Sequence, residues 1–147
     1  MPVQYILFPV DLSEVSRVLV PWVKEMAVKH QARVLVLFVA RAFEHYAGMG
    51  VPLPYINNFE EEVAKQGEMR LREFMEINFR DPLVSSKVVT GYPSEEILKM
   101  ARSERPDMII MGTHGRRGLE KIIFGSVAEE VVKKSPVPVL LIPPTQS

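Results

Sequence analysis

Short apolar runs alternate with longer amphipathic stretches along this chain of 147 residues. Five of the runs are rich in β-branched, aromatic or other apolar residues and too short for helices, which is typical of strands. They cover residues 3–8, 34–39, 84–90, 108–111 and 137–142. The run at 108–111 is apolar throughout, which favours a strand that is buried on both faces of a parallel sheet. Pro9 is expected to end the first strand.

The stretches between these runs carry apolar residues at helical spacing. Ser13 is a good N-cap for the first helix. Its predicted inner face consists of Val15, Val18, Leu19, Trp22, Val23, Met26 and Ala27. Pro21 lies within that pattern and is expected to kink the helix. The stretch from Arg41 to Tyr55 has no clear period and is expected to be a long loop.

Asn57 or Asn58 is expected to cap a second helix that runs to about Arg80. Its predicted inner face consists of Val63, Ala64, Gly67, Leu71, Phe74 and Met75. A third helix is predicted from Pro93 to Pro106, and a fourth begins at Gly125-Ser126 and ends near Lys134. Five strands that alternate with helices predict one doubly wound α/β domain, a layer sandwich with helices on both faces of a parallel sheet.

Composition narrows the classes of function. A hydrophobic content of 47% over this length is enough for one domain with a substantial core. Lysine plus arginine and aspartate plus glutamate both number 18, so no global charge attracts nucleic acid or an anionic membrane. There is no cysteine, and no apolar run is long enough for a membrane span. These features predict a cytoplasmic protein whose binding depends on a local site.

The stretch after the fourth strand contains the clearest chemical signal. Gly112, Gly115 and Gly118 follow that strand at intervals of three residues, so the backbone is able to approach a ligand without a Cβ in the way. The pair Gly125-Ser126 then begins the last helix, where unpaired amides and the positive end of the dipole favour an anion. We interpret this stretch as a phosphate cradle.

Other interpretations of the same residues remain open. Ser126 is an N-cap in any interpretation, and Asp11 could simply form the turn before the first helix. His114, Arg116 and Arg117 could contact phosphates or be solvated. The chain has neither a G-x-G-x-x-G nor a G-x-x-x-x-G-K-[ST] motif, which argues against the Rossmann and Walker types of nucleotide site. It also lacks H-E-x-x-H and G-x-S-x-G, so no zinc held by the protein and no hydrolase elbow is expected.

The spacing G-x-x-G, nine residues, G-S is met by Gly112, Gly115, Gly125 and Ser126, and it resembles the nucleotide-binding signature of the universal stress protein family. The resemblance extends from the segment 5–13 at the front of the chain to the segment 136–143 at the back. It implies the strand order 3-2-1-4-5, which places the ends of the first and fourth strands side by side where the winding reverses.

Members of that family that carry the signature bind ATP. The resemblance therefore implies an ATP site, with ADP or AMP as alternatives and Mg²⁺ held through the phosphates near Asp11. The implied nucleotide-binding residues are Pro9, Val10, Asp11, Val39, Met111, Gly112, His114, Gly115, Arg116, Gly125, Ser126 and Val127. It also implies a homodimer through the last strand, at Val137, Val139, Leu140, Leu141 and Ile142.

Binding is the first functional hypothesis: a nucleotide-dependent stress or signalling module with no catalytic residue and an unidentified protein partner. The second hypothesis is an enzyme that slowly hydrolyses ATP or transfers its phosphoryl group, with Asp11 positioning a metal or water. The third hypothesis is a dimerising scaffold with an unoccupied site. Proline cannot donate to a β-ladder, so Pro136 and Pro138 independently place the last strand at a sheet edge. An apolar edge of this kind is a hazard unless a second copy covers it.

Overall fold

The structure is a computed structural model that describes residues 2–41, 53–113 and 125–143, with side chains described from Asn58 onward in the second of these ranges. The strands are β1 (Tyr5–Val10), β2 (Arg33–Ala40), β3 (Val84–Thr90), β4 (Met108–Gly112) and β5 (Val139–Ile142). The helices are α1 (Glu14–His30), α3 (Leu53–Asn78), α4 (Pro93–Glu104) and α5 (Ser126–Lys134).

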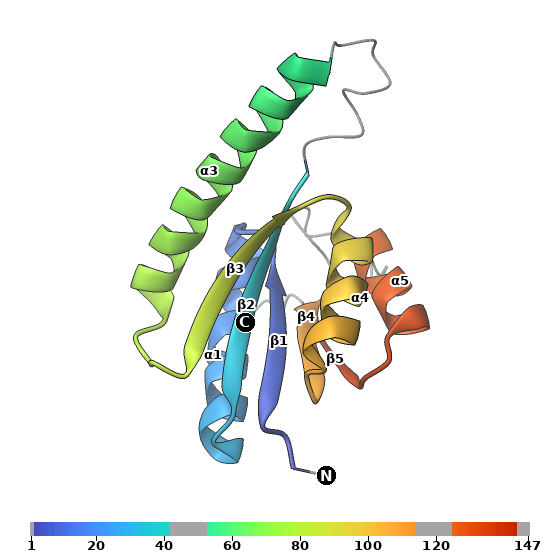
Figure 1. Cartoon of the computed structure of the whole chain (residues 1–147). Helices are drawn as coiled ribbons and strands as arrows, with labels where there is room; N and C mark the ends of the chain where they lie inside the picture. Colours follow the sequence, from blue (N-terminus) through green and yellow to red (C-terminus); the bar gives the residue numbers. More distant parts are fainter. Residues whose placement is uncertain (1, 42–52, 114–124, 144–147) are drawn as a thin grey trace.

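The strands form one parallel sheet in the order β3-β2-β1-β4-β5 (Figure 1). This confirms the predicted fold class and strand order. The winding reverses between β1 and β4, because β2 and β3 continue on one side of β1 whereas β4 and β5 lie on the other. At such a point the loops after two neighbouring strands diverge to opposite faces of the sheet and leave a crevice.

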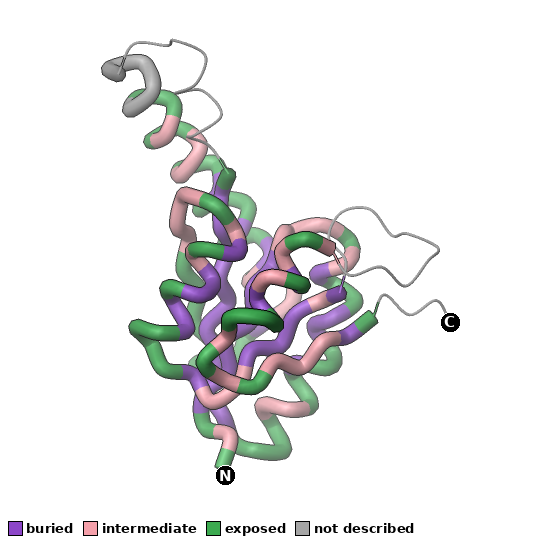
Figure 2. Tube along the Cα trace, turned by 90° about the vertical axis from the view of Figure 1, so that its right-hand side faces the viewer, coloured by how far each residue is buried: buried purple, intermediate pink, exposed green. Residues whose placement is uncertain are grey.

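Two apolar layers cover the two faces of the sheet. Alternate residues of each strand face opposite sides, so Ile6 and Phe8 pack with α1 and α3 whereas Leu7 and Leu37 pack with α4 and α5. The central strands are buried almost throughout, and the exposed residues lie on the outer sides of the helices, in loops and on the edge strand β3 (Figure 2). The sheet therefore forms a rigid platform whose ends are defined by the chain segments that leave it.

Several predicted boundaries and faces were wrong. β1 continues through Pro9 to Val10. The Tyr5 carbonyl accepts from the β4 side, so alternation turns Pro9 to that side too, where the register with β4 ends at Leu7 and no donor is needed. α3 begins at Leu53, before the expected Asn57 or Asn58 cap, and so takes in the end of the predicted loop. On α1, Val18 and Trp22 are exposed, at 43% and 49%, because α1 covers the sheet with a narrower stripe than its apolar pattern suggests.

The last strand is shorter than predicted. Val137 lies outside β5, which begins at Val139, after both prolines. β5 pairs with β4 and stands at the end of the strand order, so the predicted edge position is confirmed. Pro21 lies inside α1, whose assignment is continuous from Glu14 to His30, and the expected kink stays a prediction.

Candidate functional site

A cleft of about 1090 Å³ lies beyond the carboxyl ends of β1, β2 and β4, at the reversal of winding. This volume is slightly above the range of roughly 300–1,000 Å³ that is usual for small-molecule sites. The strand ends, α1 and α3 from one face of the sheet, and α4 and α5 from the other all contribute to its walls. The cleft therefore spans both faces of the sheet end.

Most of the predicted nucleotide-binding residues line this cleft. They are Pro9, Val10, Asp11, Val39, Met111, Gly112, Gly125, Ser126 and Val127. They come from four separate segments of the chain, which the strand order brings together. His114, Gly115 and Arg116 lie outside the described residues.

The second half of the glycine signature is held against the end of β4. The Gly125 amide donates to the Thr113 carbonyl at 2.7 Å, and the Thr113 amide donates to the Ile142 carbonyl at 3.2 Å. Gly125, and not Ser126 as predicted, is the N-cap of α5, with a φ of −63° and a ψ of 157°. Because the N-cap is a glycine, that position supplies no side chain to bond the amides of the first turn.

The turn after β1 carries the acidic residue of the cleft. Asp11 Oδ1 accepts hydrogen bonds from the Ser13 amide at 2.9 Å, the Ser13 hydroxyl at 2.6 Å and the Ser16 hydroxyl at 2.8 Å. Ser13 in turn caps α1 by accepting from the Val15 amide at 3.2 Å. The interpretation of Asp11 as a turn former is therefore correct. A contact between Asp11 and a ligand would involve its second carboxylate oxygen, Oδ2.

The sequence interpretation missed a second group of cleft residues. Phe38, Ala40 and Arg41 lie beside the predicted Val39 at the end of β2. Their position at the carboxyl end of a strand could have identified them as cleft residues from the sequence. α3 adds Phe59, Glu62, Val63, Gln66, Gly67 and Arg70. These recur at helical spacing, but nothing local shows that this face turns toward the end of the sheet. The upper part of α3 extends beyond the strand ends in Figure 1.

A polar contact ties the two helices of the other wall together. Ser94 in α4 is buried, and its hydroxyl donates to Glu130 Oε2 in α5 at 2.9 Å. Lys134 Nζ donates to Glu130 Oε1 at 3.1 Å. The Ser94 hydrogen bond, followed by the Lys134 ammonium, lowers the pKa of Glu130 below its ordinary value. The pair joins two helices whose first turns both line the cleft.

The described part of the chain contains neither a metal-binding cluster nor a membrane-spanning helix. Residues 2–41, 53–113 and 125–143 contain no group of three histidine, cysteine or acidic side chains placed to hold a metal ion. None of the helices in these ranges has the length and apolarity needed to span a membrane.

Comparison with known proteins gives the family. The model of the universal stress protein family matches residues 2–143. The chain belongs to the universal stress protein family. It is 33% identical to universal stress protein MJ0577 of Methanocaldococcus jannaschii, over 97% of each chain. It is 29% identical to a universal stress protein of Thermus aquaticus, over 93% of this chain and 96% of that protein.

Solved structures of the family share the fold. The structure of MJ0577 superposes with a TM-score of 0.74 at 33% identity and covers all of both chains. UspA of Lactobacillus plantarum superposes with a TM-score of 0.77 at 22% identity, over 97% of this chain and 99% of that one. A universal stress protein solved in complex with cAMP has a TM-score of 0.62 at 18% identity, over 99% of this chain and 100% of that one.

Proposed function

We propose that this universal stress protein binds an adenine nucleotide, ATP in the first place, in the cleft at the carboxyl end of the sheet. One observation carries the proposal: Gly112 at the end of β4 and Gly125-Ser126 at the start of α5, both parts of the glycine signature, line the same cleft as Asp11 and Val39. Residues 1–147 would then form one nucleotide-binding domain. A universal stress protein of the same fold was solved with cAMP, which is consistent with an adenine nucleotide.

The two sides of the cleft offer complementary chemistry to such a ligand. The N-cap of α5 is a glycine without a capping side chain, and the amides and dipole of the first turn favour phosphate oxygens. Asp11 offers carboxylate oxygen to a sugar hydroxyl or, through the phosphates, to Mg²⁺. Val39, Met111 and Val127 supply an apolar wall for a base. ADP and AMP would meet the same groups with fewer phosphate contacts.

Binding, and not turnover, is the proposed activity. Hydrolysis requires a group that activates water or a metal that neutralises the developing charge. Oδ1 of Asp11 already accepts three hydrogen bonds, and among the described residues Asp11 belongs to no group of three histidine, cysteine or acidic side chains that could hold a metal. The bound nucleotide would instead order the segments at the end of the sheet and change a surface that a protein partner recognises. The cytoplasmic location stays a prediction.

Titration calorimetry with ATP, ADP and AMP, with and without Mg²⁺, tests the proposal. A Gly125→Val variant should bind ATP at least about tenfold more weakly, because the valine side chain keeps phosphate away from the amides of α5. The φ and ψ of Gly125 are open to any residue, so the fold should persist, and circular dichroism would check it. A wild-type protein that binds none of the three nucleotides would refute the proposal. If the wild-type protein released phosphate from ATP and Asp11→Ala abolished that release, the alternative of an ATP-hydrolysing enzyme would be favoured.

We also propose that two copies pair through β5. The carbonyls of Pro138 and Ile142 accept from the β4 side, at 2.9 and 3.2 Å, so alternation along the strand turns the peptide groups of Val139 and Leu141 outward. This edge is apolar and only half-buried. A second copy would satisfy its outward amides and cover its side chains.

The pairing can be tested at the outward amide of Leu141. Leu141→Pro removes that donor and no ladder bond to β4, so it should convert a dimer to a monomer on a sizing column with light scattering. Leu141→Ala keeps the amide and controls for the lost side chain. An unchanged dimer in Leu141→Pro, or a monomeric wild-type protein, would contradict pairing through this edge.

A further inference from the structure

The turn that joins β1 to α1 has a backbone conformation that needs support. Leu12 has a φ of +63°, in the left-handed region that a leucine side chain rarely adopts. It directly follows Asp11 and precedes the N-cap Ser13. A turn of this kind persists only where surrounding contacts hold it. The hydrogen bonds around it identify the residue that does so.

Ser16 makes every hydrogen bond that its hydroxyl group is able to make. It donates its proton to Asp11 Oδ1 at 2.8 Å, and its oxygen accepts from the Asp11 amide at 3.1 Å and the Leu12 amide at 3.2 Å. A hydroxyl has one donor and two acceptor positions, so none remains. Ser16 is also only 2% exposed. It lines the cleft but has nothing left to offer a ligand, and so acts only through its neighbours.

These contacts fix which atoms the β1 side of the cleft presents. With three donors on Oδ1, the Asp11 carboxylate is held in one orientation, and among the described residues Oδ2 accepts no hydrogen bond. The amides of Asp11 and Leu12, which could otherwise attract phosphate, are occupied by Ser16. The β1 side therefore offers an acceptor with negative charge, whereas the α5 side offers amide donors.

This asymmetry determines how a nucleotide would lie. Phosphates are repelled by the Asp11 carboxylate and attracted to the start of α5, whereas sugar hydroxyls are the donors that Oδ2 lacks. We propose that Ser16 is a positioning residue that holds the Asp11 carboxylate with Oδ2 toward the ribose hydroxyls, so that Ser16 controls selectivity for the sugar without touching it. This inference depends on the proposed nucleotide site.

The experiment compares ATP with 2′,3′-dideoxy-ATP, which lacks both hydroxyls. The wild-type protein should prefer ATP by about tenfold, the size expected for a hydrogen bond to a charged group. Ser16→Ala should weaken ATP binding by most of that factor and leave dideoxy-ATP binding nearly unchanged. In an Asp11→Ala background, Ser16→Ala should have no further effect on either ligand. Ser103→Ala, a serine in α4 that bonds only to Met100 among the described residues, is the matched control.

The outcomes separate this inference from the proposed site itself. A loss for both ligands by the same factor would show a merely structural role, and no loss for either would show that Ser16 does not matter; both overturn the inference. Binding of ATP and dideoxy-ATP with equal affinity by the wild-type protein would also overturn it while sparing the site. Absence of any nucleotide binding refutes the site. If Ser16→Ala does not fold, Ser16→Cys fills the same space with a weak donor and should show the same selective loss.

Discussion

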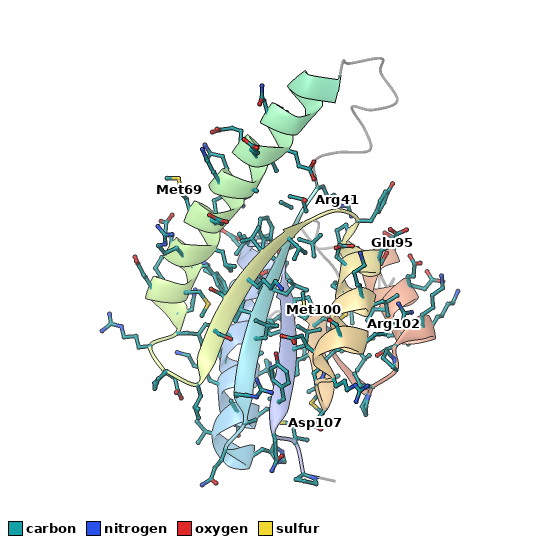
Figure 3. All side chains as sticks on the ribbon, in the orientation of Figure 1. Arg41, Met69, Glu95, Met100, Arg102 and Asp107 are labelled. Atoms are coloured by element: carbon teal, nitrogen blue, oxygen red, sulfur yellow. The ribbon has the colours of Figure 1, made fainter. Side chains whose placement is uncertain are left out.

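Each end of β1 lies beside an aspartate that accepts hydrogen bonds through one carboxylate oxygen, and the two aspartates differ in their surroundings. At the amino end, Asp107 Oδ2 accepts from the Gln4 amide at 2.9 Å and the Tyr5 amide at 3.0 Å, and the Asp107 amide donates to the Tyr5 carbonyl at 2.8 Å. The Tyr5 hydroxyl donates to Glu104 at 3.3 Å, and the Arg33 guanidinium lies 3.6 Å from the centre of the Tyr5 ring. Figure 3 shows Asp107 at this end of the sheet and Arg41 at the other.

At the carboxyl end the aspartate and a helix start face a cleft. Asp11 is likewise bonded through one oxygen, but it lines the cleft together with Gly125 and Ser126 at the start of α5. The cleft is lined by Asp11 and not by Asp107, so we expect the contacts of the amino end to contribute to stability and those of the carboxyl end to serve a ligand. If so, substitutions at the two ends should affect different measurements.

The largest effect on stability is expected at the amino end. Asp107→Ala leaves the Gln4 and Tyr5 amides without their acceptor and should lower the free energy of unfolding by about 1–3 kcal/mol. Nucleotide affinity should not change, because the cleft lies at the opposite end of the strand. Urea unfolding and calorimetry measure the two quantities. Asp107→Asn keeps an acceptor oxygen and should cost less; a loss of affinity in Asp107→Ala would remove the distinction between the ends.

At the carboxyl end the corresponding change is Ser126→Pro. Proline is favoured at the first position of a helix, and the ψ of 157° at Gly125 suits a following proline, so the fold should keep its stability. The substitution removes one amide and one hydroxyl from the cleft, and ATP affinity should fall roughly tenfold. Ser126→Ala removes the hydroxyl alone, so its ATP affinity should fall less. Equal affinities in both variants would indicate that the amide does not bind phosphate.

The contributions of the two ends to stability should also depend on opposite extremes of pH. At the amino end the titrating group is Tyr5. Burial, reinforced by the Glu104 carboxylate, raises the pKa of Tyr5 above its ordinary value of 10.0. A raised pKa means that the folded state holds the proton more tightly, so this stabilisation is complete below about pH 10 and is lost as the pH rises further. Tyr5→Phe should flatten the alkaline decline of the free energy of unfolding. An identical decline in the variant would exclude Tyr5 as its source.

The smallest effect is expected from the pair beside the cleft. Because the Ser94 hydroxyl and then Lys134 lower the pKa of Glu130 from 4.5, their stabilisation is present above that pH and is lost as the pH falls through the lowered value. The stability difference between the wild-type protein and Ser94→Ala should therefore shrink in acid. Unfolding curves at several pH values measure it, with Ser103→Ala as the control. A difference that is constant with pH would show that packing alone is lost.

Much of the architecture could be predicted from local sequence. The runs rich in apolar and β-branched residues predicted all five strands, although β3 carries Ser85, Ser86 and Lys87 and has no buried residue. The predicted inner residues Leu19, Val23, Leu71 and Phe74 are buried. Boundaries were less accurate. Asparagine before an apolar pattern suggested a cap at 57 or 58, yet α3 begins at Leu53, so the local capping preference does not set the start of this helix.

The candidate site also contains residues that the sequence predicted and residues that only the structure revealed. The sequence by itself determined the residues whose chemistry is local: the glycines that free the backbone after β4, the helix start at 125–126, and the acidic turn after β1. The strand order came from the family resemblance, because nothing in an apolar run specifies its neighbour. Only the tertiary structure decided that α3 lines the cleft, because that depends on how the elements are oriented in space and residue type alone does not determine it. Ser16 lies only four and five residues from the groups that it bonds, but those bonds depend on the left-handed backbone at Leu12, which residue type does not predict either.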